Sequence, residues 1–101
     1  MLTYKNFRAE FEREVLNIII RQTNSFTMKD IFRELKKKCD STIPSDYIVD
    51  IVFVSLEFCE SQDFIRTYDK TTYSLSRINR DKLDAFIEKL NNKNLSENNT
   101  F

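Results

Sequence analysis

The sequence predicts one small domain that is mainly α-helical, with a short β-hairpin and an additional helix after it. Four stretches carry apolar residues mostly at steps of three and four, which is the spacing of an α-helix. A fifth stretch, residues 64–76, alternates and is rich in aromatic and β-branched residues, as β-strands are. The chain has 101 residues, 41% hydrophobic and 32% charged, which favours a folded domain over a disordered chain or a membrane span. We expect residues 1–91 to form this domain and residues 92–101 to be a disordered polar tail.

The first helix is expected to run from about Tyr4 to Gln22. Its apolar residues recur on one side and predict a single buried stripe. The stripe consists of Phe7, Phe11, Val15, Ile18 and Ile19. Arg8, Glu12 and Arg13 fall outside the stripe, so we expect them to face solvent.

The second helix has the clearest start signal in the chain. Thr27 can accept a hydrogen bond from the first turn, and Asp30, three residues later, can return one to the cap. Phe26 before the cap and Ile31 four residues after it match a hydrophobic staple. The lysine triplet 36–38 falls in the last turn, where cations suit the helix dipole. The triplet is either a solvated helix end or a phosphate-binding group.

A third helix is expected from Ser45 to about Ser61, after a loop over residues 40–44. Apolar residues cover more than half of its circumference, so it should be the central helix of the domain. The face opposite the buried one collects four acidic residues around one aromatic: Asp46, Asp50, Phe53, Glu57 and Glu60.

The hairpin is expected to pair residues 64–68 with residues 72–76 around the turn 69–71. Because the chain has no Gly, we expect a loop longer than the two-residue primed turns. The last helix should run from Asn79, its cap, to Asn91. Its apolar stripe can fold back on the core or pair with its equivalent in a dimer. That stripe consists of Leu83, Phe86, Ile87 and Leu90.

The absence of Gly and His argues against an enzyme. Phosphate-binding loops need Gly where the backbone approaches the phosphate, and imidazole serves as a base or a metal ligand in many active sites. Cys39 and Cys59 cannot complete a zinc site alone, and their expected separation along the helices is too long for a disulfide. We therefore expect no catalytic residue, cofactor, metal or small-molecule ligand. With no signal-like or membrane-spanning stretch, a cytoplasmic protein with reduced thiols is predicted.

From Phe26 to Leu75 the chain resembles the winged helix-turn-helix superfamily. The resemblance rests on the capped segment FTMKDIFRELKKK, the loop and helix IPSDYIVDIV, and the stretch LEFCESQDFIRTYDKTTYSL. The matching positions in the last stretch are Leu56, Cys59, Asp63, Ile65, Tyr73 and Leu75. The resemblance implies a three-helix core with a β-hairpin wing, and a small DNA-binding regulator of transcription. The turn before the wing often carries a Gly with positive φ in this superfamily, and here Asp63 or Gln62 must take that place.

The distribution of charge gives a first hypothesis, binding of double-stranded DNA. The neutral total hides a net charge of +4 over residues 21–39 and +3 over residues 64–82. Lys and Arg that neutralise phosphates supply most DNA affinity. The residues expected to contact the phosphates are Lys29, Arg33, Lys36, Lys37, Lys38, Arg66 and Lys70. Ser45 and Tyr47 are expected to lie nearest the bases.

The same distribution supports an alternative, a protein-interaction module that can be a homodimer. Residues 40–63 contain six acidic residues and no basic one, so the helix that would enter the major groove is anionic. Phe53 in the middle of carboxylates is typical of a protein-binding anchor with a polar rim. Either the first or last helix covers Phe53, or the acidic face around it, with Asp46, Asp50, Glu57 and Glu60, binds a partner.

Overall fold

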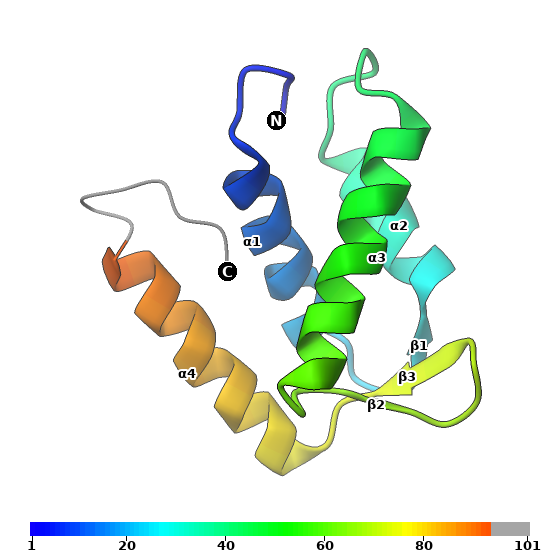
Figure 1. Ribbon diagram of the computed structural model, residues 1–101, viewed down its shortest axis with the longest axis vertical. Helices are drawn as coiled ribbons and strands as arrows, with labels where there is room; N and C mark the ends of the chain where they lie inside the picture. Colours follow the sequence, from blue (N-terminus) through cyan, green and yellow to red (C-terminus); the bar gives the residue numbers. More distant parts are fainter. Residues whose placement is uncertain (94–101) are drawn as a thin grey trace.

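The computed structural model describes residues 1–93, which form four helices and three short strands (Figure 1). The helices are α1 (Arg8–Ile20), α2 (Met28–Lys37), α3 (Ser45–Ser61) and α4 (Arg77–Lys93). The strands β1 (Phe26–Thr27), β2 (Arg66–Thr67) and β3 (Thr72–Ser74) form one antiparallel sheet in the order β1-β3-β2. The prediction of a mainly helical fold with a hairpin and a further helix is confirmed. The predicted tail is wrong at residues 92–93, which belong to α4, and its remainder, 94–101, lies outside the described residues.

Helix α3 has the predicted bounds, whereas α1 is shorter than predicted at both ends. Before α1, the backbone of Leu2 pairs with the chain around Cys39, and residues 4–6 form a turn. The Leu2 N–H donates to the carbonyl of Lys38 at 2.8 Å, and the Asp40 N–H donates to the carbonyl of Leu2 at 2.7 Å. Phe7 is the N-cap of α1 and 58% exposed, so its predicted place in the buried stripe is wrong.

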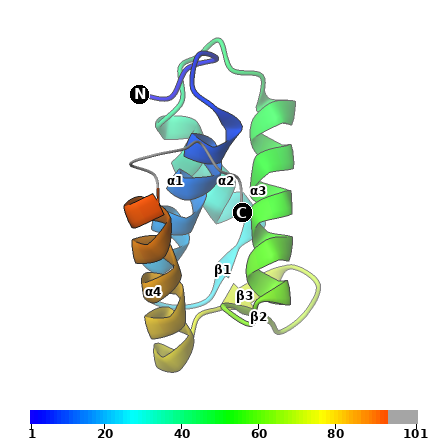
Figure 2. The ribbon, with the colours of Figure 1, turned by 60° about the vertical axis from the view of Figure 1, so that its left-hand side comes forward.

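The core lies where α1, α2 and α3 meet, and α4 packs on α1 (Figure 2). Figure 2 shows α1 and α4 on one side of the molecule, α3 on the other, and the hairpin below α3. Cys39 and Cys59 are free and buried in the same core, in agreement with the prediction of no disulfide. The completely buried side chains come from all four helices and include Val15, Leu16, Ile19, Ile31, Leu35, Ile51, Val52 and Leu83.

Glu12 contradicts the prediction that it faces solvent, because it is only 4% exposed. Its Oε2 accepts from Arg8 Nε at 3.3 Å, and Arg8 Nη2 pairs with Asp50 Oδ2 of α3 at 3.0 Å. Loss of hydration raises the pKa of the Glu12 carboxyl, and the bond from Arg8 only partly opposes this. Packing of the other helices around α1 therefore places a carboxylate inside the protein.

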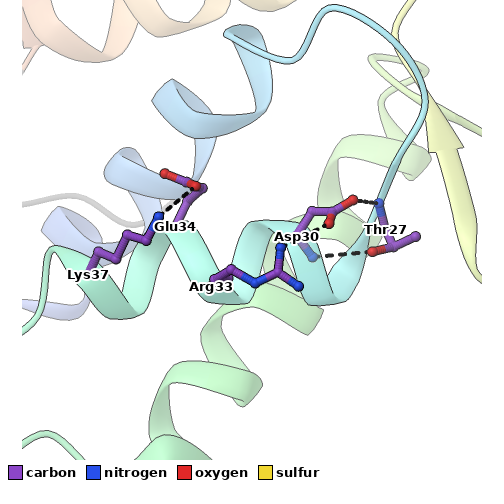
Figure 3. Close-up of polar contacts among 5 residues, drawn as sticks. All are labelled: Thr27, Asp30, Arg33, Glu34 and Lys37. Carbon is purple, nitrogen blue, oxygen red and sulfur yellow. Dashed lines mark hydrogen bonds and ion pairs between the residues drawn. The ribbon is translucent and has the colours of Figure 1, made fainter.

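The start of α2 confirms the predicted capping box (Figure 3). The Asp30 N–H donates to Thr27 Oγ1 at 3.2 Å, and the Thr27 N–H donates to Asp30 Oδ2 at 2.9 Å. Phe26 and Ile31, the predicted staple, are both buried in the core. These contacts satisfy two N–H groups that a helix start would leave without partners.

The sheet contains one strand that the sequence did not predict. Phe26 pairs with Tyr73 and Thr27 with Thr72, so the residues that start α2 also extend the hairpin. The rings of Phe26 and Tyr73 stack with centroids 5.8 Å apart. The hairpin loop is longer than two residues, as predicted, and the Asp69 carboxylate accepts from the N–H groups of Thr71 and Thr72. Those bonds lower the pKa of Asp69.

Asp63 has a φ of 61° and takes the left-handed conformation expected before the hairpin. Asp tolerates this conformation better than most residues other than Gly. Its N–H donates to the carbonyl of Glu60, and the N–H of Phe64 donates to the carbonyl of Cys59 at 2.9 Å. The carbonyls at the end of α3 are thereby satisfied without a Gly.

Helix α4 begins two residues earlier than predicted, at Arg77. Ser76 Oγ accepts from the Asn79 N–H at 3.2 Å, so the cap predicted at Asn79 is wrong, and Asn79 is instead buried. The apolar stripe of α4 folds back on the core, where Leu83 is completely buried. The guanidinium of Arg80 donates to the carbonyls of Ile20 and Gln22, at the C-terminal end of α1.

Candidate functional site

A groove of about 660 Å³ opens between the start of α2, the exposed face of α3 and the loop of the hairpin. Figure 1 shows these three elements on the side of the molecule away from α4. Its walls are mainly apolar, with lysines at the rim. The lining residues are Thr27, Met28, Lys29, Phe32, Val49, Phe53, Lys70, Thr71 and Tyr73.

Phe53 and Val49 form the α3 wall of this groove. They are four residues apart on the helix, hence on one face, and are 48% and 40% exposed. Helix α4 lies against α1 (Figure 2), and the exposure of Phe53 shows that neither helix covers it fully. The ring of Tyr73 at the hairpin end is held in place by stacking on Phe26. The groove is therefore an apolar surface that residues 1–93 leave uncovered.

Three lysines stand at the rim of the groove or beside it. Lys29 and Lys70 are exposed, and neither has an ion pair with any of residues 1–93. Lys36 Nζ donates to Ser45 Oγ at 2.9 Å and lies 5.6 Å from the centre of the Phe32 ring. These three positive charges are free of carboxylates within the described residues.

Two of the other predicted phosphate-binding cations form ion pairs within α2. Arg33 pairs with Asp30 at 3.6 Å and Lys37 with Glu34 at 3.4 Å, both within α2 (Figure 3). A shallow hollow of about 460 Å³ beside α2 brings four of the predicted cations together. Its lining is Lys29, Phe32, Arg33, Lys36 and Lys37.

Lys38 and Arg66 lie away from this group. Lys38 Nζ pairs with Glu14 of α1 at 3.3 Å, on the side of α2 that faces α1. Arg66 is exposed on β2, which is separated from β1 by β3. Neither residue lines the groove or the hollow.

Ser45 and Tyr47, predicted to lie nearest the bases of DNA, point in different directions. Ser45 is exposed at the start of α3 and bound by Lys36. Tyr47 is half-buried, and its ring meets the edge of the Phe11 ring of α1 with centroids 5.4 Å apart. The structure therefore does not bring the two side chains together.

The four carboxylates of the α3 face are all exposed, as predicted. Asp50 pairs with Arg8, and Glu60 accepts from the hydroxyl of Thr67. Asp46 and Glu57 have no ion pair among residues 1–93. At 100° per residue, both lie beside Phe53 on the flank nearer α1, whereas Val49 lies on the flank nearer the groove.

The electrostatics of the groove differ from one end to the other. Burial of the Tyr73 hydroxyl raises its pKa, and the negative charges of Glu60 and Glu57 add to this effect. Lys70 lies in the same hairpin wall of the groove as Tyr73, and Lys29 lies on α2. Around α3, Asp46 and Glu57 lie on the other side of Phe53 from Val49, whereas Glu60 lies between Phe53 and Val49.

Sequence reasoning identified Phe53 but missed most of the groove around it. Val49 carried a usable signal, since it is four residues before Phe53 on the same face. Met28, Phe32 and Tyr73 carried no such signal. Their place in the groove depends on the pairing of β1 with β3, which joins residues far apart in the sequence.

A scan against protein-family models found no match, and neither curated proteins nor solved structures yielded a similar protein. Residues 1–93 contain no group of three or more His, Cys, Asp or Glu side chains placed to hold a metal ion. Over the same residues, no helix combines the length and hydropathy needed to cross a membrane.

Proposed function

We propose that this chain is a non-enzymatic, winged-helix-like interaction module whose docking surface is the groove between α2, α3 and the hairpin. One observation carries the proposal: Phe53 remains 48% exposed on the central helix, directly beside apolar walls. A half-exposed aromatic in an apolar groove with a charged rim has the composition of a binding hot spot. The element order, three helices followed by a hairpin, supports the winged-helix description.

The charge of α3 favours a protein partner over DNA. The helix has no basic residue, and four carboxylates surround its exposed aromatic. Carboxylates at this position would repel phosphates, whereas DNA affinity depends on neutralising them. A protein partner can place apolar groups on Phe53 and polar groups on the rim.

The proposal is tested by locating where selected peptides bind. Peptides of about 16 residues are selected from a displayed random library on the wild-type protein. Their dissociation constants are then measured by fluorescence anisotropy for wild type, Phe53→Glu and Ile78→Glu. Ile78 is a matched control, because it is apolar, 71% exposed and located at the start of α4.

We expect Phe53→Glu to weaken binding by about tenfold or more, which corresponds to about 1.4 kcal/mol. Ile78→Glu should leave binding within about twofold. Far-UV circular dichroism and the urea midpoint establish that both variants are folded. Peptides that bind Phe53→Glu as tightly as wild type would place the docking surface elsewhere and overturn the proposal.

Binding of double-stranded DNA is the second candidate, as part of a transcription regulator. It is favoured by the hollow on α2, where Lys29, Arg33, Lys36 and Lys37 lie together. Phosphates would contact these residues and Lys70, with α3 turned away from the bases. The test is the affinity for random-sequence duplex between about 50 and 200 mM salt. Binding that falls steeply with salt and is lost in Lys36→Glu supports this candidate, and no binding at low salt removes it.

A further inference from the structure

We infer that the groove is occupied by a second copy of this chain, in a two-fold dimer that places Phe53 of each α3 in the groove of the other. This inference rests on the proposed function, because it names the partner for the same surface. A two-fold interface uses the same patch on both copies, so that patch must be complementary to itself. The face around the groove meets this requirement in shape, hydrophobicity and charge.

The shape is complementary because one face carries both an anchor and a receptor. Phe53 projects from α3 and is 48% exposed, while Met28, Phe32 and Tyr73 line the space beside it. A two-fold rotation about an axis alongside α3 brings each Phe53 ring over the other copy's groove. Each copy then buries an aromatic that is left exposed in the single chain, and aromatic side chains contribute strongly to such interfaces.

The charges are complementary because ion-pair-free groups of the two signs lie on the two sides of Phe53. Lys29 and Lys70 line the groove on α2 and the hairpin, and at 100° per residue Asp46 and Glu57 lie on the other side of Phe53 from Val49. None of these four has an ion pair among residues 1–93. The rotation that seats Phe53 sets the lysines of one copy opposite the carboxylates of the other.

The overall charge of the chain favours the same assembly. Sixteen basic and sixteen acidic residues leave a net charge of zero, so two copies do not repel one another at long range. The local charges then determine how the copies meet, since complementary patches fix the register of an interface.

The test is the mass of the full chain by sedimentation equilibrium from about 1 μM to 1 mM, a range that covers weak homodimers. The single chain has a mass of 12.1 kDa, so dimer formation doubles it. Four proteins are compared: wild type, Phe53→Glu, Lys29→Glu with Lys70→Glu, and Asp46→Lys with Glu57→Lys. We expect wild type to dimerise and each variant to dimerise at least about tenfold more weakly.

A mixture of the two charge variants is the decisive sample. In the mixed pair every reversed margin meets a margin of opposite charge, so we expect a heterodimer within about threefold of wild-type affinity. Lys5→Glu with Lys82→Glu is the control for net charge, because both lysines are exposed and lie outside the groove. This control should keep the wild-type dimer.

Three results would overturn the inference. A wild-type mass that stays at that of one chain up to 1 mM excludes the homodimer, while Phe53-dependent peptide binding would still support docking at the groove. A dimer that persists unchanged in Phe53→Glu and in both charge variants has its interface elsewhere. A mixture of charge variants that fails to associate, with both variants folded by circular dichroism, excludes the proposed two-fold arrangement.

Discussion

Replacement of Arg80 by Met tests how α4 is attached to the rest of the fold. The guanidinium of Arg80 donates to the carbonyls of Ile20 and Gln22, which lie at and beyond the end of α1. Carbonyls at a helix end lack partners within the helix, and a cation there also suits the helix dipole. Met keeps much of the apolar stem of Arg but removes the charge and both donors.

The expected loss follows from the two bonds. A hydrogen bond to a charged group contributes about 1.5–3 kcal/mol, and Arg80 is half-buried, so the two bonds together should contribute about 2–3 kcal/mol. For a domain of this size each kcal/mol shifts the melting temperature by roughly 4–8 °C. We therefore expect Arg80→Met to melt at least about 8 °C below wild type.

The assay is thermal unfolding and urea unfolding, both followed by far-UV circular dichroism, with all proteins at one concentration because association changes apparent stability. Lys82→Met is the matched control, since Lys82 is an exposed cation two residues further along α4. It should unfold within about 0.5 kcal/mol of wild type. An Arg80→Met protein as stable as the Lys82→Met control would refute the role assigned to Arg80.

Three further changes test separate parts of the fold. Glu12→Gln should stabilise the protein by about 1 kcal/mol at pH 7, because it removes a buried charge whose hydration is lost on folding. The pKa of the Glu12 carboxyl is raised in the folded chain, so its protonation favours folding. This stabilisation is complete below the ordinary pKa of 4.5 and is lost as the pH rises through the raised pKa. The advantage of Gln should therefore shrink toward pH 4, and urea midpoints that differ equally at both pH values would contradict this account. Thr27→Ala should cost about 1–2 kcal/mol in urea unfolding, through loss of the cap bond to Asp30, and a change below about 0.3 kcal/mol would show that the cap adds little. Burial raises the pKa of the Cys59 thiol to about 12, so at pH 8 only about one thiol in ten thousand is ionised, and a disulfide reagent should label Cys59 only after urea is added. Labelling of folded Cys59 at the rate of a free thiol would show that the core opens locally.

Features determined within one or two helical turns were predicted correctly. The Thr27–Asp30 capping box, the bounds of α3 and the left-handed residue before the hairpin all depend on atoms close together in the chain. That residue is Asp63, one of the two candidates that the sequence offered. The apolar stripe of α4 was correct for the same reason, because periodicity alone identifies the face that can be buried. For Phe53, the sequence left open whether the first or last helix covers it or it stays exposed on the acidic face of α3.

What failed depends on contacts between distant segments. Phe7 was predicted to be buried, but Leu2 pairs with Cys39 and α1 begins only at Arg8, which leaves Phe7 as an exposed N-cap. Glu12 was predicted to be exposed, but it is buried, and its partner Arg8 also pairs with Asp50 of α3. Residue spacing defines which faces a helix has, and it does not determine which neighbour lies against each face.

The candidate site also has features that the sequence determined and features that depend on packing between distant segments. The sequence by itself determined that α3 is anionic, that Phe53 lies in the middle of its carboxylates, and that lysines occur before and after it in the chain. Only the tertiary structure decided that Met28, Phe32 and Tyr73 meet Phe53 in one groove, and that Tyr47 turns toward Phe11. The physical reason is that helix faces and caps arise from local backbone geometry, whereas a groove exists only where packed elements leave a surface uncovered.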